Sequence, residues 1–584
     1  MLSLGTEALY RVDVVIPLII GLLAVIWAVS RSKRHRLAGL PNAQDSIAVF
    51  EARKDRGLVE LVQRYGKNFR MHLTGSAKGV AGASEVFATA DPAIVRKVLM
   101  DRVHSVVRPP RYALARWIPY MDGVLFMDGP VWKAHTAALL PVLAPSNFEK
   151  FAKAMHLSTE RRMAMVEESV RAANAAKGSA QPFFEVDMLP LAKVGWFCMA
   201  CAPQCSFLLL SALCFCAHRF FFIVCQAIAL DNLLTAGFGV DLKSPLVNEL
   251  RSSMRDYVDV DNMREDAHPL VTVFKTIVNW FRIGARVKRN IRTLLAAGPE
   301  TRISLGADGE LFKPTADQLR RWQAPTAKTT GNEAMTAADL QSSDSAQPAK
   351  QTDGHVTFLD RMVAAGMSLD EITSETNHLN GAHKAFGVEL TFSLFELARS
   401  PDIRNRLMSE LDQVLSRNNR TVPTRADLAA LPYCQAVFKE VLRRHCISMG
   451  IVRVIAEPLQ VADVKGSKGP VTVPANTPVL LLMHAVHHLP EFWDDPETFN
   501  PDRWLKPNGK LRSQPKTKFS YFPFLEGPRQ CQGRFFVVLE WLCVVNAMLR
   551  RYDISLPPNY VMAKKADFYP IPETPISIRF APRA

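Results

Sequence analysis

The stretch Phe524-Leu-Glu-Gly-Pro-Arg-Gln-Cys-Gln-Gly533 decides the fold. It satisfies the pattern F-x-x-G-x-R-x-C-x-G at every fixed position, namely Phe524, Gly527, Arg529, Cys531 and Gly533. At ordinary amino-acid frequencies, roughly one chain in ten thousand of this length would contain the pattern by chance. A cysteine on its own is most often a buried structural residue near a turn. The complete match around Cys531 predicts a chemical role for its sulfur.

The stretch resembles the cysteine loop of the cytochrome P450 family, the heme-thiolate monooxygenases. The resemblance implies that Cys531 is the axial ligand to the iron of heme b, because a thiolate pushes electron density towards bound oxygen and favours O–O cleavage. It also implies that Arg529 pairs with a heme propionate and that Phe524 shields the sulfur from water. Gly527 and Gly533 would let the backbone approach the porphyrin closely.

A second motif lies in a helix predicted to start near Pro432. Glu440 and Arg443 are three residues apart and therefore share one face of that helix. The family carries this E-x-x-R together with a downstream arginine, here Arg503 in Phe-Asn-Pro-Asp-Arg-Trp. The resemblance implies a structural ion cluster of the three residues that braces the cysteine loop. Each pair alone would be interpreted as a solvated surface pair.

A capping box at 368–371 predicts a helix that runs to about residue 400. Within it lies Asn-Gly381-Ala-His383-Lys384, where the family typically has Ala-Gly-x-Asp/Glu-Thr. Gly381 matches, and it would let the helix bend so that oxygen can reach the iron. His383 stands in place of the acid and Lys384 in place of the alcohol, which is the main departure of this chain from the family pattern.

This departure bears on catalysis, because oxygen activation at a heme needs protons. His383 could supply them, since the pKa of histidine lies near neutrality, and Lys384 could orient a substrate carboxylate or shuttle protons if burial lowers its pKa. Alternatively, both side chains point into solvent or another helix. Three hypotheses therefore stand. They are a monooxygenase served by an NADPH–cytochrome reductase, a peroxide-rearranging isomerase or dehydratase, and a non-catalytic heme-binding protein.

Further heme contacts are predicted on two other segments. Trp132-Lys-Ala-His135-Thr136 resembles the W-x-x-x-R helix of the family, with Thr136 in place of the arginine. His135 or Trp132 would then supply the missing propionate contact. Arg453 matches a strand arginine that often binds a propionate. Without this context, a lone tryptophan or arginine is more often a core or surface residue.

The 584-residue chain is long enough for a large core, and its formal net charge is +15. It contains no nucleic-acid-binding motif, and the charge is spread along the sequence. A membrane surface or an acidic redox partner therefore explains the charge better than a nucleic acid does.

Residues 14–30 are uncharged and mostly apolar, and four basic residues follow within 31–36. As a helix this stretch would be about 25 Å long, near the minimum for a bilayer span. It predicts a single-pass membrane anchor within 1–36, with the catalytic domain, 37–584, in the cytosol. The resemblance implies the membrane of the endoplasmic reticulum. The alternative is a cleaved signal peptide.

Residues 194–226 interrupt the expected domain. Zinc binding by their cysteines is a weak alternative, because no second ligand pair follows. A second membrane span would divide the heme domain between two sides of the bilayer. The hypothesis we favour is a retained intron, because the codons AAG-GTG-GGT for 193–195 and TGC-CAG for 225–226 would match splice sites. Six of the ten cysteines lie here: Cys198, Cys201, Cys205, Cys214, Cys216 and Cys225.

The overall prediction is a single large, mainly helical heme domain with a small β region around 60–100 and 447–480. Residues 301–354 are poor in large apolar side chains and predict a disordered linker. The pocket is expected to be apolar, which favours a lipid, sterol or terpenoid substrate. Its predicted lining segments are 105–126, 243–285, 376–384, 447–452 and 568–570.

Overall fold

The computed structural model describes the chain in blocks. The described residues are 37, 39–44, 56–73, 85–101, 106–107, 123–125, 127–143, 147–175, 183–188, 228–238, 240, 249, 269–296, 304–305, 311–312, 316, 357–562, 564–565, 571–572 and 576–583. The predicted anchor at 14–30, the insert 194–226 and most of the predicted linker 301–354 lie outside them. No helix that the structure describes has both the length and the apolar character of a membrane span.

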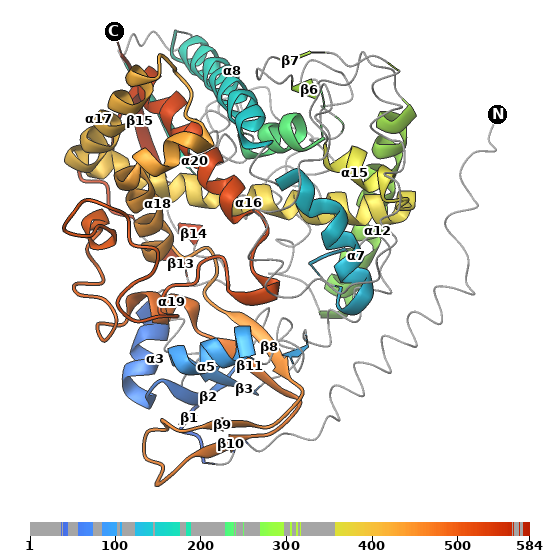
Figure 1. Ribbon diagram of the computed structural model, residues 1–584, viewed down its shortest axis with the longest axis vertical. Coiled ribbons are helices and arrows are strands. Elements are labelled where there is room, and N and C mark those ends of the chain that lie inside the picture. Colours follow the sequence, from blue (N-terminus) through green and yellow to red (C-terminus); the bar gives the residue numbers. More distant parts are fainter. Residues whose placement is uncertain are drawn as a thin grey trace, which may run out of the picture.

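A six-stranded mixed sheet forms the β region, in the order β1-β2-β3-β11-β8-β4 (Figure 1). Strand β3 (Glu85–Thr89) pairs in parallel with β11 (Thr477–Leu481), and β11 pairs antiparallel with β8 (Ile451–Ile455). Strands β8 and β11 are rich in Val, Ile and Leu, and β3 carries Val and Phe, all of which suit a pleated and buried surface. The sheet therefore joins the two segments predicted around 60–100 and 447–480, and that prediction is confirmed.

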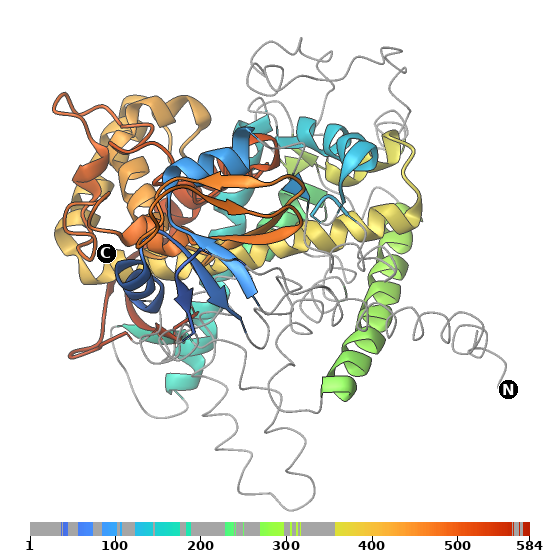
Figure 2. The ribbon, with the colours of Figure 1, turned by 90° about the horizontal axis from the view of Figure 1, so that it is seen from below.

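Helix α16 (Leu369–Arg399) crosses the middle of the molecule in both ribbon views (Figures 1 and 2). Its 31 residues correspond to a length of about 46 Å. The predicted capping box is present, because the Ser368 side chain accepts from the Glu371 N–H and the Glu371 carboxylate accepts from the Ser368 N–H. Residues 386–398 are buried throughout. The long helix predicted from 368–371 to about 400 is confirmed.

Four other helices build the body around α16: α8 (Phe148–Ala175), α12 (Pro269–Ala296), α18 (Pro432–Arg444) and α20 (Arg534–Arg551). Helices α12, α18 and α20 pack against α16, and α8 packs against α20. One of the two main hydrophobic clusters of the described residues fills the space between α16, α18 and α20, with Phe392, Phe438 and Trp541 among its members. The mainly helical fold is thus confirmed.

Shorter elements complete the described part of the domain. Other α-helices are α3 (Gly57–Tyr65), α5 (Pro92–Arg96), α7 (Gly129–Leu139), α15 (Phe358–Ala364), α17 (Pro401–Arg417) and α19 (Met483–His488). Single 3₁₀ or π turns occur at Lys97–Asp101, Leu140–Leu143, Leu233–Gly237, Arg425–Ala430, Pro501–Trp504 and Gly527–Arg529. Other strands are β1 (Asn42–Ala43), β2 (Asn68–His72), β4 (Val106–Val107), β5 (Phe184–Met188), β6 (Ser304–Leu305), β7 (Leu311–Phe312), β9 (Leu459–Val461), β10 (Val471–Val473), β12 (Tyr552–Ser555), β13 (Lys564–Lys565), β14 (Ile571–Pro572) and β15 (Ile576–Pro582).

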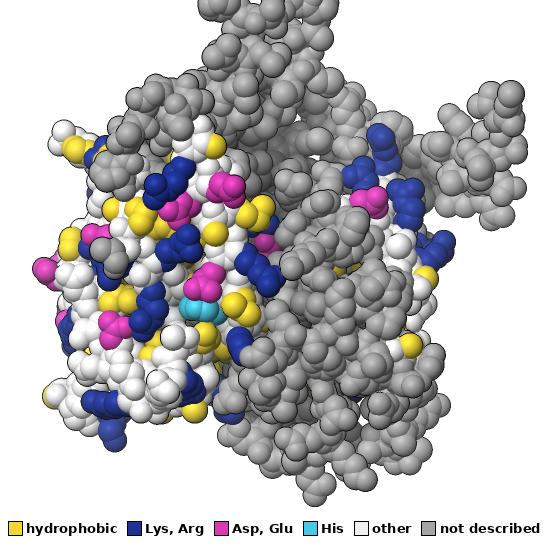
Figure 3. Space-filling view, turned by 90° about the horizontal axis from the view of Figure 1, so that it is seen from above, with side chains coloured by type: hydrophobic (Ala, Val, Ile, Leu, Met, Phe, Trp, Pro, Cys, Tyr) yellow, Lys and Arg dark blue, Asp and Glu magenta, His cyan; other side chains and the backbone are white. Residues whose placement is uncertain are grey.

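Two further observations bear on the predictions, one on the linker and one on the surface charge. Strands β6 and β7 form a short antiparallel pair inside the segment predicted as a disordered linker. On the larger described area of the face in Figure 3, lysine and arginine side chains are interspersed with aspartate and glutamate. That part of the surface therefore shows the spread of charge that the sequence indicated.

Candidate functional site

The cysteine loop is a compact turn that ends where α20 begins. The Cys531 N–H donates to the Phe524 carbonyl (2.7 Å), and the Gln530 N–H donates to the Gly527 carbonyl (2.9 Å). Gly527 has a φ of +76°, and a Cβ there would lie 2.3 Å from the Leu99 carbonyl oxygen. Glycine is required at this position because of both the turn and the close approach of another backbone segment. The approach of Gly527 to a porphyrin stays a prediction.

The Cys531 side chain is exposed to solvent, although protein atoms surround it closely. Burial raises the pKa of the Cys531 thiol, while a hydrogen bond from the Gly533 backbone and the positive charge of Arg534 lower it. Solvent therefore reaches Cys531 although other protein atoms lie close to it. It also lies at the N-terminus of α20, where the helix dipole favours negative charge on sulfur.

Gly533 plays a different part from Gly527. It is the N-cap of α20 with a φ of −81°, which other residues can adopt. A Cβ at this position would lie 3.9 Å from the Cys531 sulfur, an ordinary van der Waals distance. Phe524 is half-buried and packs against the hydrophobic cluster between α16, α18 and α20, with its ring 6.5 Å from that of Phe438. The heme-related roles of Gly533 and Phe524 stay predictions.

Arg529 joins the loop to the start of α7. Its guanidinium pairs with the Asp128 carboxylate, donates to the Met127 carbonyl (3.0 Å) and stacks on the Trp132 ring, 3.7 Å from Cζ to the ring centroid. Two residues predicted to contact heme, Arg529 and Trp132, are thus brought together from distant parts of the sequence. The sequence reasoning missed Asp128. Its place before Gly129-Pro indicates a helix start but carries no sign of a distant arginine.

Two further polar residues of α7 face different partners. Thr136 Oγ1 accepts from Gln532 Nε2 (3.2 Å), directly beside the predicted ligand. His135 Nδ1 donates to Glu375 Oε1 of α16 (2.7 Å), and its Nε2 lies 3.5 Å from Glu371 Oε1. The hydrogen bond to Glu375 raises the pKa of His135. Both ring nitrogens of His135 thus face carboxylates of α16, and its predicted contact with a propionate stays a prediction.

The structure describes only some of the residues that were predicted to act on the oxygen-binding side of the heme. His383 lies on α16 with 4% of its surface exposed, so it does not point into solvent. The structure describes neither the surroundings of Gly381 nor the Lys384 side chain. Arg453 is half-buried on β8, and its Nη1 donates to the Val452 carbonyl (3.0 Å). The functional roles given to these four residues stay predictions.

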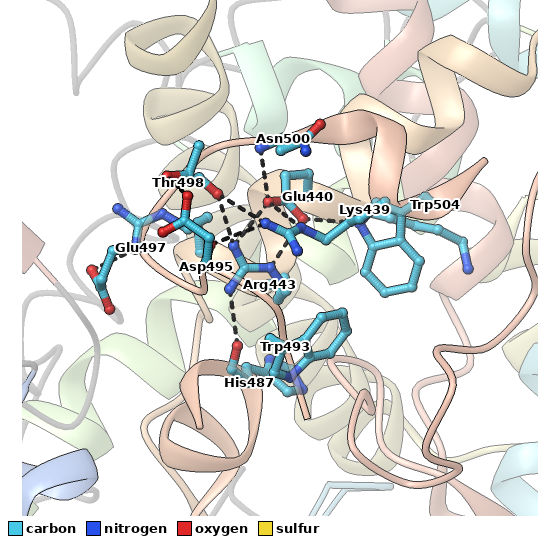
Figure 4. Close-up of polar contacts among 12 residues, drawn as sticks. Lys439, Glu440, Arg443, His487, Trp493, Asp495, Glu497, Thr498, Asn500 and Trp504 are labelled. Carbon is cyan, nitrogen blue, oxygen red and sulfur yellow. Dashed lines mark hydrogen bonds and ion pairs between the residues drawn. The ribbon is translucent and has the colours of Figure 1, made fainter. Parts of the chain in front are cut away.

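The predicted ion cluster is present and centres on Glu440 (Figure 4). Arg443 donates to both carboxylate oxygens, from Nε to Oε2 (3.0 Å) and from Nη2 to Oε1 (2.8 Å). Arg503 Nε and the Asn500 N–H also donate to Oε1, and Trp504 Nε1 donates to Oε2, each at 3.0 Å. The sequence reasoning missed the Asn500 and Trp504 contacts, although both residues flank Arg503 in the motif.

The cluster also reaches the chain that leads to the cysteine loop. Arg443 donates to the His487 carbonyl (3.0 Å), and the His487 ring in turn accepts from the Phe522 N–H (3.1 Å). Phe522 lies two positions before Phe524, where the loop begins. The bracing role that the resemblance implied therefore has a hydrogen-bonded route in the structure.

Comparison with known proteins agrees with this geometry. The profile of the Cytochrome P450 family matches residues 327–579, which include the long helix, the ion cluster and the cysteine loop. This part of the chain is similar to the cytochrome P450 family. The members of that family carry heme, and the described residues fit such a group. Cys531 offers a reachable sulfur at a helix N-terminus, and Arg529 holds a fixed positive charge in the same loop.

Among curated relatives, Cytochrome P450 4V2 of Rattus norvegicus is 33% identical over 173 residues, covering 30% of this chain and 31% of the relative. Cytochrome P450 4c3 of Drosophila melanogaster is 29% identical over 206 residues, covering 34% and 36%. Cytochrome P450 3A18 of Rattus norvegicus is 29% identical over 205 residues, covering 35% and 39%. The chain spans about a third of the length of the cytochrome P450 relatives that it matches.

Proposed function

We propose that this chain is a heme-thiolate monooxygenase that inserts one oxygen atom into a hydrophobic small molecule. The placement of Cys531 carries the proposal: its sulfur is reachable by solvent, lies among dense protein atoms and stands at the N-terminus of α20. The match of residues 327–579 to the model of the cytochrome P450 family supports the same function.

In this proposal the heme, when bound, supplies the oxygen chemistry, and the chain supplies orientation and electrostatics. With the group bound, Cys531 Sγ would carry a negative charge, which the Gly533 N–H, the α20 dipole and the Arg534 charge favour against the effect of burial. Arg529, which is held between Asp128 and the Trp132 ring, would pair with a propionate of the bound group.

On the distal side, we propose that the chain itself holds the proton that oxygen chemistry requires. His383 is buried on α16, where one ring nitrogen can hold or pass a proton. Gly381 would give the helix freedom to bend, and Lys384 would orient a substrate group or take part in proton transfer. These roles rest on the sequence positions of the three residues within the helix.

The remaining parts of the proposal follow from sequence and resemblance. The substrate would be a lipid, sterol or terpenoid, and the electrons would come from a membrane-bound NADPH–cytochrome reductase. The apolar stretch 14–30 would anchor the protein in the endoplasmic reticulum as a single-pass protein with a cytosolic catalytic domain.

A direct test is the absorption spectrum of the reduced, carbon-monoxide-bound protein. A strongly red-shifted Soret band is expected, because that shift reports a thiolate ligand. Cys531→Ser should abolish the band, whereas Cys543→Ala, which removes a buried thiol within helix α20, should keep it. A wild-type protein that takes up no heme, or whose band survives the loss of Cys531, would rule out the proposal.

A second candidate function is the rearrangement of peroxides, which is favoured by one observation. His383 and Lys384 stand where the family typically has an acid and an alcohol, and an isomerase needs neither reductase nor proton relay. Substrate-dependent NADPH consumption with a reductase supports the monooxygenase. Turnover of a fatty-acid hydroperoxide without a reductase supports the isomerase, and the absence of both activities supports a non-catalytic heme-binding protein.

A further inference from the structure

Helix α7 lies between the cysteine loop and the long helix α16 and touches both. Towards the loop, its Trp132 ring stacks with Arg529 and its Thr136 hydroxyl accepts from Gln532. Towards α16, it presents His135 to the carboxylate of Glu375. The position of α7 therefore ties the location of the Cys531 loop to that of α16.

The contact with α16 is short and buried, and it is an ion pair when His135 is protonated. His135 Nδ1 donates to Glu375 Oε1 at 2.7 Å, and the side chains are 6% and 0% exposed. The same Glu375 carboxylate accepts the Val124 N–H at 3.0 Å, which fixes the loop just before α7. One carboxylate of α16 thus holds both the helix and the segment that leads into it.

A buried pair of this kind holds its two helices in one relative position, because the loss of either partner is costly. Removing one member leaves the other as an uncompensated charge in a poorly solvated place. Neutral packing would tolerate small shifts of α7 along α16, whereas a 2.7 Å hydrogen bond between two charged groups does not. The pair therefore defines one relative position of the two helices.

We propose that His135 and Glu375 are positioning residues that form a charged clasp, and that this clasp sets the separation between the Cys531 loop and helix α16. The proposal rests on the proposed function in one respect, namely that heme and substrate bind in the space between the Cys531 loop and helix α16. The two residues act through α7, Arg529 and Gln532, and they are not catalytic residues.

The clasp should be pH-dependent. The hydrogen bond to Glu375 raises the pKa of His135 above its ordinary value, so the stabilisation is complete at low pH and is lost as the pH rises through the raised pKa. The charged groups that face His135 are Glu375 and Glu371 of α16. From α15, the side chain that reaches α7 is Arg361, whose Nε donates to the Ala138 carbonyl (3.5 Å).

The test is hydrogen exchange of the full-length, heme-loaded protein over a pH series, with protection corrected for the intrinsic pH dependence of exchange. In the wild type, peptides covering 123–139 and 369–379 should lose protection at least about tenfold as His135 deprotonates. His135→Gln should show low protection with no such step. Glu375→Gln should move the step to lower pH, because the partner that raises the pKa is gone.

Glu371→Gln is the matched control, because Glu371 is one turn away on α16, 44% exposed and at the longer distance of 3.5 Å. It should move the step to lower pH by less than Glu375→Gln does, because Glu371 also faces His135 and adds a smaller contribution to its raised pKa. The clasp would be refuted if His135→Gln still lost protection in a step as the pH rises. It would also be refuted if Glu375→Gln lowered protection equally at every pH and left the step at its wild-type pH. The carbon-monoxide spectrum of the same samples tests the proposed function separately, since a missing band in the wild type leaves the exchange result standing.

Discussion

Replacement of Glu440 by glutamine should be among the most damaging single changes in the described part of the chain. Glu440 and Arg443 are both fully buried, and the carboxylate accepts five hydrogen bonds. Glutamine has nearly the same size, but its amide nitrogen would face N–H donors of Arg443, Trp504 or Arg503. The substitution therefore tests charge and hydrogen bonding with little change in packing.

The expected loss of stability follows from the state of the Arg443 guanidinium in the variant. Without the carboxylate, the Arg443 guanidinium remains buried, and among the described residues it keeps the His487 and Thr498 carbonyls as acceptors and the Trp493 ring as a neighbour. Breaking a buried ion pair by removing one member costs about 3–5 kcal/mol. A typical domain has about 5–15 kcal/mol of total stability, so Glu440→Gln should remove a large share of it.

Urea unfolding, followed by tryptophan fluorescence and checked for reversibility by dilution, measures the loss. The control is Glu497→Gln, which breaks a 2.9 Å pair with Arg444, where Glu497 is 49% exposed. That pair should contribute about 0–1 kcal/mol. Equal small losses in the two variants, each below about 1 kcal/mol, would refute the reasoning. Since the cluster is structural, Glu440→Gln protein that still folds should keep the thiolate spectrum.

Three further outcomes are expected. Gly527→Ala should cost about 1–3 kcal/mol in urea unfolding and weaken the carbon-monoxide band, because φ is positive and Cβ would meet the Leu99 carbonyl, whereas Gly469→Ala, with open space around it, should be harmless. Burial raises the pKa of Glu389 from 4.5 to about 8, so the folded state binds the extra proton between these values and stability falls as pH rises. Glu389→Gln should flatten that fall in urea midpoints, and an unchanged slope would contradict it. Sequencing of mature transcripts should show that the codons for 194–226 are removed, and their uniform retention would exclude the intron hypothesis.

The sequence alone determined the elements whose signals are local. The fixed spacing around Cys531 predicted the loop, the three-residue spacing of Glu440 and Arg443 placed both on one helix face, and the capping box at 368–371 marked the start of α16. Each of these patterns depends on backbone geometry over a few residues. A short stretch of sequence can therefore carry all the information that is needed.

The choice of partners was decided only by the tertiary structure. Arg529 pairs with Asp128, 401 positions away, and His135 with Glu375, 240 positions away. Gly527 is required partly by the carbonyl of Leu99, which no local pattern announces. These contacts exist because packed helices bring distant side chains together, and a charged group that becomes buried must take whichever counter-charge the packing places beside it.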